Sequence, residues 1–311
     1  MESSQSELAL PNIVEAARAI RPYLSPTPLV HATLLSKHFG RSIWLKLESE
    51  SPVGSFKARG ALRCLMEHAK AGRHVFTTAS TGNHGMAVAY AGHRLGLTTH
   101  IFVPHDASPR KITLIGEYTS NLVLTECDFD AAKELAHELA NEKGYYFIDD
   151  GGETSIVEGT GTIGLEILAE RRPEAVVVPV GNGALISGIG TVIKQLSPQT
   201  RVIGVQPAQA ATMYLSWKER RPVRLDKVST IADGLASRVA VPEAVDLMLK
   251  VVDEMVLVSE QQILAALNLV VRLEARIIEP SSAAAIAALS LPELRERDVV
   301  AIMTGRNYEL A

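Results

Sequence analysis

Lys57 lies in a segment that is typical of a reactive amine. The segment reads Gly-Ser-Phe-Lys-Ala-Arg-Gly-Ala over residues 54–61, so small residues flank the lysine, an aromatic precedes it and a cation follows two positions on. A solvated lysine titrates near about 10.4, but partial burial and the nearby charge of Arg59 would both disfavour the ammonium form. A free amine can condense with an aldehyde. The alternative is a surface lysine at the start of a helix over 58–69.

Two further segments have the pattern of a turn from a strand into a helix. The apolar run 74–78 leads into Ala-Ser-Thr-Gly-Asn-His-Gly at 79–85, and a helical stretch follows at 86–91. The run 175–180 leads into Gly-Asn-Gly-Ala-Leu at 181–185 and then into another helical stretch. Turns of this kind direct backbone N–H groups at an anion bound over the helix N-terminus. The two segments therefore predict anion sites.

The elements that would position these residues alternate along the chain. Helical patterns, such as those at 131–143 and 261–272, lie between most of the apolar, β-branched runs. This alternation predicts an α/β fold with parallel sheets flanked by helices. Ligands in such folds bind at the carboxyl ends of strands, where both turns lie. The predicted strands are 43–47, 74–78, 99–103, 121–124, 175–180, 201–205 and 299–303.

Composition excludes several classes of function. The chain has 311 residues, of which 47% are hydrophobic and 21% charged, which favours a globular protein with two lobes. A net charge of -4 provides no basic face for nucleic acid. Residues 175–193 are uncharged, but Pro179 and the glycines favour a strand, a loop and a buried helix over a membrane span.

Cysteine and histidine usage points to a cytoplasmic protein without a metal site. Cys64 and Cys127 are the only cysteines, too few for a disulfide framework or a Cys-x-x-Cys site. The first residues lack the basic start and apolar stretch of a signal peptide. The nine histidines show no metal-ligand spacing. We therefore expect a cytoplasmic location and no bound metal.

The lysine segment, the Ser-Thr-Gly-Asn-His turn and the glycine turn, in this order and spacing, resemble the fold-type II pyridoxal phosphate enzymes. The likeness is greatest to the branch of threonine and serine dehydratases and serine racemases, phenylserine dehydratase included. It extends over nearly the whole chain, through Pro-Thr-Pro-Leu at 26–29, Ile-Ala-Asp-Gly at 231–234, Glu-Pro-Ser at 279–281 and Thr-Gly-Arg-Asn at 304–307. The resemblance implies a two-lobed fold like that of the tryptophan synthase β subunit and pyridoxal 5'-phosphate as the cofactor.

The resemblance also implies how the lobes divide the chain. Residues 1–69 and 150–311 would form a large lobe that binds the cofactor, and residues 70–149 a small lobe inserted into it. The segment Asp-Asp-Gly-Gly-Glu at 149–153 would be the return crossing between the lobes. Relatives of this kind are usually homodimers, so we expect a homodimer.

The resemblance assigns the cofactor contacts. Lys57 would hold the cofactor as a Schiff base and later remove the α-proton of the substrate, with Phe56 packed against the cofactor. Asn83 would contact the pyridoxal oxygen, although its position alone also suits a helix cap. The predicted phosphate turn consists of Gly181, Asn182, Gly183, Ala184 and Leu185.

This turn departs from the usual glycine-rich loop at Asn182 and Ala184. Asn tolerates positive φ better than other non-glycine residues, so we expect phosphate binding to persist. A dinucleotide fingerprint is the alternative interpretation of the same turn. Its third glycine and its acidic residue are not in register.

The substrate would lie against the first turn. By resemblance, Ser80, Thr81, Gly82 and His84 contact the substrate carboxylate, and His84 could instead be a structural histidine. Racemisation needs an acid on the face opposite the lysine, where the racemases have a serine and this chain has Thr81. Because Thr81 carries a hydroxyl, an amino-acid racemase is the alternative activity. The extra methyl group of the threonine crowds the site and favours dehydration.

Thr304 would lie beside the pyridine nitrogen, where the family usually has serine. A hydroxyl cannot hold that nitrogen protonated as a carboxylate can. A neutral ring is a poorer electron sink, which favours elimination of a β-substituent over transamination. Arg306 replaces a common glycine, and its sequence context suggests no role.

Two positions indicate that the family's divalent-cation site is lost. Gln206 stands where a glutamate is usual, and Thr212 stands where an aspartate is common. Magnesium and calcium depend on anionic oxygen ligands. The substitutions predict that no divalent cation is bound there and that the site is empty or holds a monovalent ion.

The sequence thus predicts an enzyme that converts a β-hydroxy amino acid into a 2-oxo acid and ammonia. The segment Asp-Phe-Asp-Ala at 128–131 matches the threonine dehydratase pattern and lacks an arginine for a second substrate carboxylate. Threonine, serine or an apolar analogue such as phenylserine is therefore favoured. The chain ends soon after Asn307, which favours a catabolic role. A non-catalytic binding protein that kept the fold is the other alternative, and Lys57 and Asn83 argue against it.

Overall fold

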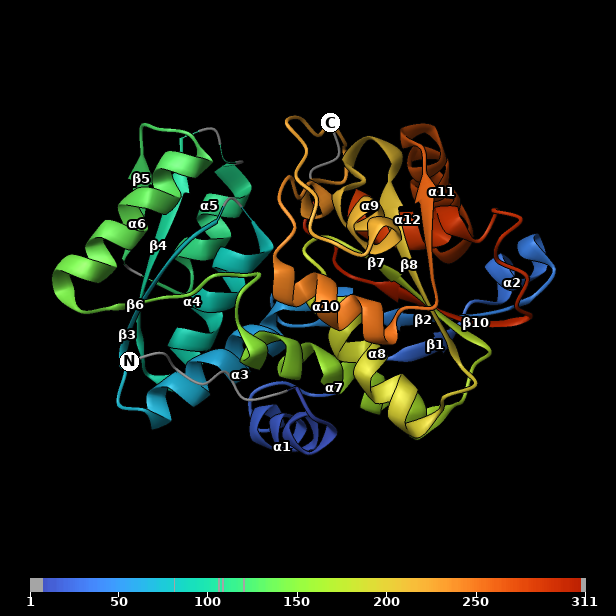
Figure 1. Ribbon diagram of the computed structural model, residues 1–311, viewed down its shortest axis with the longest axis horizontal. Helices are drawn as coiled ribbons and strands as arrows, with labels where there is room; N and C mark the ends of the chain where they lie inside the picture. The colour runs from blue at the N-terminus through green and yellow to red at the C-terminus, as the bar shows by residue number, and fades with distance from the viewer. Residues whose placement is uncertain (1–7, 81, 106, 108, 120, 309–311) are drawn as a thin grey trace.

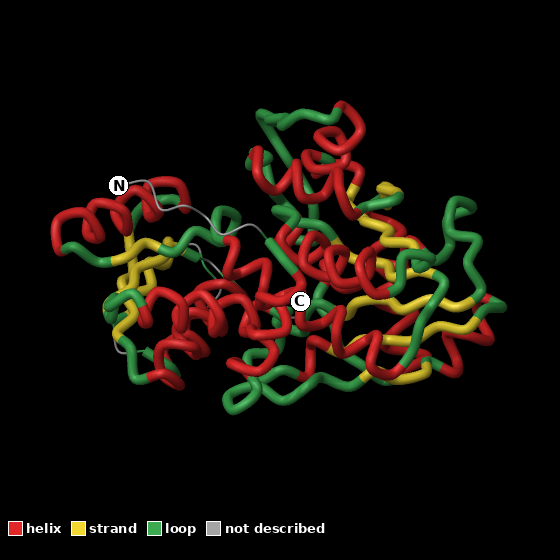
Figure 2. Tube along the Cα trace, turned by 60° about the horizontal axis from the view of Figure 1, so that its bottom comes forward, coloured by secondary structure: helices red, strands yellow, loops and turns green. Residues whose placement is uncertain are grey.

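The computed structural model describes residues 8–80, 82–105, 107, 109–119 and 121–308. Its strands form two sheets, which stand apart in Figure 1 and are drawn as separate groups in Figure 2. The larger sheet has six strands in the order β1-β2-β10-β7-β8-β9, and the smaller has four in the order β5-β4-β3-β6. The strands are β1 (Leu29–His31), β2 (Ser42–Leu47), β3 (Val75–Ala79), β4 (Thr98–Pro104), β5 (Leu122–Thr125), β6 (Tyr146–Phe147), β7 (Ala175–Pro179), β8 (Arg201–Pro207), β9 (Glu254–Val258) and β10 (Asp298–Met303).

The predicted α/β fold with parallel sheets is confirmed. Neighbouring strands are parallel throughout both sheets except at the edge of the larger one, where β1 pairs antiparallel with β2. Each predicted run forms a strand, and the prediction omitted the short β1 and β6 as well as β9. All strands of the smaller sheet lie between residues 75 and 147, within the segment assigned to the small lobe. The lobe boundaries themselves stay a prediction.

Helices cover both sheets. In Figure 1, α4, α5 and α6 pack around the smaller sheet, α9 to α12 lie with the larger sheet, and α3, α7 and α8 run across the lower part of the molecule with α1 beneath them. The α-helices are α1 (Leu10–Ile20), α2 (Thr33–Phe39), α3 (Lys57–Lys70), α4 (Asn83–Leu95), α5 (Pro109–Gly116), α6 (Phe129–Lys143), α7 (Thr154–Glu170), α8 (Ala184–Leu196), α9 (Thr212–Glu219), α10 (Pro242–Val251), α11 (Glu260–Glu274) and α12 (Pro280–Ala288). Short 3₁₀ turns lie at Glu48–Glu50, Ala208–Ala210 and Asp233–Leu235.

Close backbone contacts hold α3, α7 and α8 together. A Cβ atom on Gly159 of α7 would lie 2.4 Å from the carbonyl oxygen of Arg59 in α3, and one on Gly188 of α8 would lie 2.5 Å from that of Val157 in α7. Such approaches are possible only without a side chain. The glycines therefore set the position of α3, and with it the position of Lys57.

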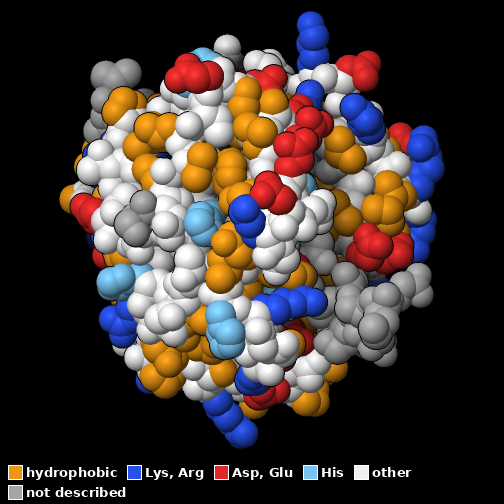
Figure 3. Space-filling view, turned by 90° about the vertical axis from the view of Figure 1, so that its left-hand side faces the viewer, with side chains coloured by type: hydrophobic (Ala, Val, Ile, Leu, Met, Phe, Trp, Pro, Cys, Tyr) orange, Lys and Arg blue, Asp and Glu red, His pale blue; other side chains and the backbone are white. Residues whose placement is uncertain are grey.

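The uncharged stretch 175–193 has the structure expected of it. It forms β7, a turn and most of α8, and every residue of β7 is buried. None of the helices in the described part of the chain is long and apolar enough to cross a membrane. On the face shown in Figure 3, basic side chains are interspersed with acidic ones.

Candidate active site

Lys57 is the first residue of α3, and the start of this helix is tied to the segment after β10. The backbone N–H of Phe56 donates to the carbonyl oxygen of Thr304 at 3.0 Å. The Lys57 amine lies 2.5 Å from a carboxylate oxygen of Asp150 and 5.2 Å from the centre of the Phe56 ring. The lysine side chain is 17% exposed, so it is neither a solvated surface amine nor completely enclosed.

Asp150 holds Lys57 and His84 together. Its second carboxylate oxygen lies 3.2 Å from Nδ1 of His84, and Nε2 of that histidine lies 3.1 Å from the hydroxyl of Thr78. Burial by itself would raise the pKa of the Asp150 carboxyl, but the charges of Lys57 and His84 outweigh it and hold the pKa below its usual range. The sequence analysis treated Asp150 only as part of the crossing between lobes. Its place immediately before a glycine pair was the available signal.

The environment expected for Lys57 was wrong in one respect. Arg59 is not a free cation beside the lysine, because its guanidinium is buried and donates to Glu48 at 2.7 Å and to Glu166 at 2.7 Å. Burial opposes its charge, yet the two carboxylates more than compensate and raise the pKa of Arg59 above its ordinary value. The charged group next to the Lys57 amine is the Asp150 carboxylate.

The Ser-Thr-Gly-Asn-His turn connects β3 to α4, as its sequence predicts. The Ser80 hydroxyl accepts a hydrogen bond from the backbone N–H of Gly82 at 3.1 Å. Gly82 occupies the N-cap position of α4, and the Asn83 side chain does not cap the helix. Thr81, the predicted substrate contact and acid, lies outside the described residues.

The Asn83 side chain faces the C-terminal part of the chain. Its Nδ2 donates to Oε2 of Glu279 at 2.9 Å, and its Oδ1 accepts from Asn307 at 2.8 Å. The Thr304 hydroxyl donates to the other oxygen of Glu279 at 3.0 Å and lies 3.0 Å from the hydroxyl of Ser282. Glu279 thus joins two residues that the sequence assigns to the cofactor.

Glu279 is a buried carboxyl that has no basic partner at hydrogen-bond distance among the residues that the structure describes. Only 4% of the residue is exposed, and burial raises its pKa to about 7, against the hydrogen bonds from Asn83 and Thr304. The negative charge of Asp233 raises it further, while Lys111 acts in the opposite direction. The sequence analysis used Glu279 only as part of a matching segment. The motif offers no sign that the carboxyl is buried.

The glycine turn joins β7 to α8. Gly183 has a φ of 97° and forms the N-cap of α8, so the left-handed position that we anticipated at Asn182 belongs to Gly183. The Asn182 side chain accepts from the N–H of Ala184 at 3.1 Å and donates to the carbonyl oxygen of Asp150 at 2.9 Å. The turn is thereby fastened to the segment that contacts Lys57. The Leu185 side chain packs into the hydrophobic core, so only the backbone of this residue belongs to the turn.

An opening lies next to Asn307. It has a volume of about 220 Å³ and is lined by Arg110, Lys111, Leu114, Ile231, Asp233, Asn307 and Tyr308. Across it, the Lys111 amine lies 2.7 Å from Asp233. A larger hollow of about 490 Å³, between the segment before β1 and α4, is lined by none of the predicted site residues.

Three residues with altered or unknown roles have ordinary structural partners. The buried Gln206 accepts a hydrogen bond from the N–H of Tyr214 at 2.8 Å, and the Thr212 hydroxyl donates to the carbonyl oxygen of Ser237 at 2.6 Å. Arg306, for which the sequence suggested no role, forms an ion pair with Glu50 at 3.2 Å.

Comparison with known proteins agrees with this geometry. Residues 20–305 match the family described as pyridoxal-phosphate dependent enzyme. The chain is 33% identical to an L-threonine ammonia-lyase of Thermotoga maritima, over 97% of this chain and 76% of that protein. It is also 33% identical to a phenylserine dehydratase of Ralstonia pickettii, over 94% of this chain and 91% of that protein. The structure of maize serine racemase superposes with a TM-score of 0.93 at 25% identity, covering 98% of this chain and 95% of the other.

Proposed function

We propose that this chain, which belongs to the family of pyridoxal-phosphate-dependent enzymes, is a dehydratase that converts a β-hydroxy amino acid into a 2-oxo acid and ammonia. The observation that carries the proposal is the set of contacts that links Lys57, His84 and Asn182 through Asp150 and links Asn83 with Thr304 through Glu279. The relatives named for threonine and phenylserine support that substrate class. We include serine, the smallest β-hydroxy amino acid.

The residues present fit pyridoxal phosphate. A Cβ atom on Gly181 would lie 2.6 Å from the carbonyl oxygen of Gly234, and Gly183 has a φ of 97° that residues with a side chain rarely adopt, so the turn favours glycine at both positions. The N–H of Ala184, the first of α8, donates to the Asn182 side chain, and the N–H groups that follow it in the first turn lack intrahelical partners and would be available to a phosphate. Lys57 would hold the aldehyde carbon of the cofactor, and Asn83 and Thr304 would contact its ring.

The cofactor, when bound, provides an electron-withdrawing ring that stabilises negative charge on the α-carbon of the amino acid. Residues of the chain then transfer the proton and orient the reacting groups. The Lys57 amine removes the α-proton, and Asp150 orients this amine because its carboxylate lies 2.5 Å away. His84 in turn orients Asp150 from the other side.

The contacts of Thr304 support elimination. Its hydroxyl donates to Glu279, a carboxyl that burial keeps partly protonated near neutral pH. The group that would face the ring is then a neutral hydroxyl, and the carboxyl behind it would be one residue removed from the ring and not fully charged. Such surroundings do not favour a protonated ring nitrogen. A short-lived negative charge on the α-carbon is then best relieved by loss of the β-hydroxyl group.

An amino-acid racemase is the second candidate, and the similarity to maize serine racemase favours it. The two activities differ in the fate of L-serine in deuterated water. The dehydratase releases much more pyruvate than D-serine, whereas racemisation that equals or exceeds pyruvate release would favour the racemase.

A panel of β-hydroxy amino acids, assayed for release of 2-oxo acid, tests the proposal. Lys57→Ala should abolish turnover, because the base and the point of cofactor attachment are both lost. Lys70→Ala, at the exposed end of the same helix, is the matched control and should keep wild-type turnover. Near-wild-type activity in the Lys57 variant would refute the assignment.

We also propose that the enzyme is a cytoplasmic homodimer. Leu264 and Val271 lie two turns apart on α11 and are about half exposed, as are Leu34 on the neighbouring α2 and Ile277 after α11. A group of exposed apolar side chains of this kind is common at subunit interfaces. Size-exclusion chromatography with light scattering should give the mass of two chains. A Val271→Glu variant should shift the protein toward one chain.

A further inference from the structure

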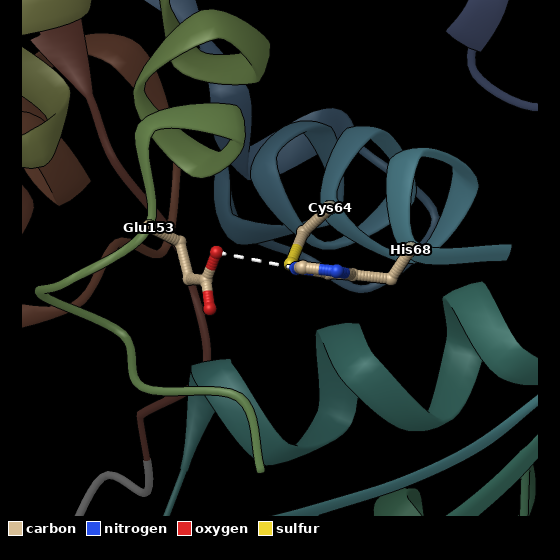
Figure 4. Close-up of side chains that lie close together, drawn as sticks. All are labelled: Cys64, His68 and Glu153. Carbon is tan, nitrogen blue, oxygen red and sulfur yellow. Dashed lines mark hydrogen bonds and ion pairs between the residues drawn. The ribbon is translucent and has the colours of Figure 1, made fainter. Parts of the chain in front are cut away.

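A second group of reactive side chains lies farther along α3, in its middle and last turns. Cys64 and His68 are one helical turn apart and point in the same direction, and Glu153 faces them from the N-cap position of α7 (Figure 4). The sulfur, an imidazole nitrogen and a carboxylate oxygen all lie within 4.8 Å of one another. Nε2 of His68 is 3.3 Å from Oε2 of Glu153. No role in the proposed reaction uses these residues.

The three side chains are protected from water to different degrees. Cys64 is fully buried, while the side chains of His68 and Glu153 are 17% and 16% exposed. Burial, together with the charge of Glu153, raises the pKa of the Cys64 thiol, so the thiol keeps its proton unless a cation is present. The Tyr146 hydroxyl donates to the other oxygen of Glu153 at 2.5 Å and fixes the orientation of the carboxylate.

We propose that Cys64, His68 and Glu153 form a binding site for a divalent transition-metal ion with the preferences of zinc. A thiolate, an imidazole and a carboxylate are the ligand types that zinc selects, whereas magnesium and calcium require oxygen ligands. Three protein ligands leave one position of a tetrahedron for water. On binding, the thiol proton passes to solvent and a metal–sulfur bond forms, so one proton is released for each ion bound.

One neighbouring residue opposes metal binding and makes the proposal testable. Nη1 of the exposed Arg73 lies 2.9 Å from Nδ1 of His68, and the guanidinium lies over the ring of Tyr146. An arginine can only donate, so Nδ1 is an acceptor here and the ring proton is on Nε2, directed at Glu153. A metal needs the lone pair of Nε2. The ring proton must then move to Nδ1, and Arg73 must leave, which its exposed position allows.

The position of the site connects it to the same two segments that form the active site. Cys64 lies two helical turns after Lys57 on α3, and Glu153 lies three residues after Asp150. A bound ion would therefore fasten the beginning of α7 to α3 at a point about two turns beyond the lysine. Because it adds a contact that the unfolded chain lacks, the ion should raise the melting temperature by about a few degrees at saturation.

Cobalt and zinc titrations of the holoenzyme, freed of metal with EDTA, test the site. Cobalt should produce the visible bands of a tetrahedral thiolate complex, at longer wavelength than the absorption of the cofactor. Calorimetry with zinc in two buffers should give one equivalent of metal and one released proton. Loss of a residue that is hydrogen-bonded to a metal ligand weakens metal binding by about 10–100-fold. Cys64→Ala removes a ligand itself, so it should weaken zinc binding by more than that. Cys127→Ala, the matched control, should bind as the wild type does.

Two more variants keep the test decisive if Cys64→Ala does not fold. His68→Gln removes a partly exposed ligand and should also abolish the cobalt bands. Arg73→Glu places an acceptor beside Nδ1 and removes a positive charge, so it should tighten zinc binding about tenfold or more. The proposal is overturned if the wild type shows no tetrahedral cobalt bands, if the bands survive in His68→Gln, or if Arg73→Glu binds zinc more weakly than the wild type.

Discussion

Replacing Glu279 with glutamine should flatten the pH dependence of stability. Glu279 is 4% exposed, accepts hydrogen bonds from Asn83 and Thr304, and has a pKa raised by burial from 4.5 to about 7. Glutamine has nearly the same shape and imitates the protonated acid. Its oxygen can accept from Asn83 while its amide group donates to Thr304, so the fold should be retained.

The sign follows from the direction of the shift. Because the pKa of Glu279 is higher in the folded state, the native protein binds this proton more tightly than the unfolded chain does. The resulting stabilisation is complete below about pH 4.5 and is lost as the pH rises through about 7. With pKa values of 4.5 and about 7, the free energy of unfolding should fall by about 2.5 kcal/mol between about pH 5 and about pH 8.

Urea unfolding of the cofactor-free protein across this pH range measures the effect. Other groups also titrate, so the informative quantity is the difference in free energy of unfolding between the wild type and Glu279→Gln at each pH. That difference should move by about 2.5 kcal/mol in favour of the variant as the pH rises. Glu170→Gln, at an exposed position on α7, is the control and should run parallel to the wild type. Parallel curves for Glu279→Gln as well would show that the buried carboxyl does not titrate in this range.

Three other substitutions test separate parts of the structure. Asp150→Asn should lower kcat/KM about 10–100-fold, because the Lys57 amine loses the carboxylate that positions it. Steady-state kinetics with the best substrate measures this change, and an unchanged kcat/KM would show that Asp150 has no part in the site. Gly183→Ala should weaken cofactor binding about tenfold, since a φ of 97° costs a residue with a side chain about 1–2 kcal/mol. A cofactor titration followed by absorbance measures the affinity, and a wild-type value would exclude a tight turn at this position. Arg59→Met should cost about 3–5 kcal/mol in urea unfolding, because the buried carboxylate of Glu48 loses its ion-pair partner and Glu166 keeps only Lys46. Arg306→Met, which breaks an exposed pair, should cost at most about 1 kcal/mol, and equal losses would contradict this account of the buried network.

Local features of the chain were readable from the sequence because they depend on neighbouring residues. The buried run of β7 is apolar at every position, and the turns at 79–85 and 181–185 have the small and polar residues that a strand-to-helix connection requires. The helix that begins at Lys57 was also expected, within one residue at each end. β9 has a similar apolar pattern and was overlooked, while β6 has two residues and no pattern to detect.

The order of the motifs along the chain was enough to identify the cofactor family and the class of reaction. Lys57, Asn83, the glycine turn and Thr304 each belong to a short segment whose chemistry is recognisable by itself. The glycine turn and Thr304 follow β7 and β10, which are neighbours in the larger sheet, so their approach is expected from the parallel order. Asn83 follows β3 of the smaller sheet, and its approach depends on how the two sheets pack. The sequence could therefore predict the site without showing its internal contacts.

Only the tertiary structure decided which groups complete the site. Asp150 is 93 residues from Lys57 and Glu279 is 196 residues from Asn83, so no local pattern pairs them. Cys64 and His68 show their helical spacing in the sequence, but Glu153 joins them from 85 residues beyond the histidine. A carboxyl has the same intrinsic acidity at every position in a chain; its protonation in the folded protein depends on desolvation and on nearby charges. Those are properties of packing, which places Asp150 beside a lysine and Glu279 in an enclosed environment where burial is the largest influence on its pKa.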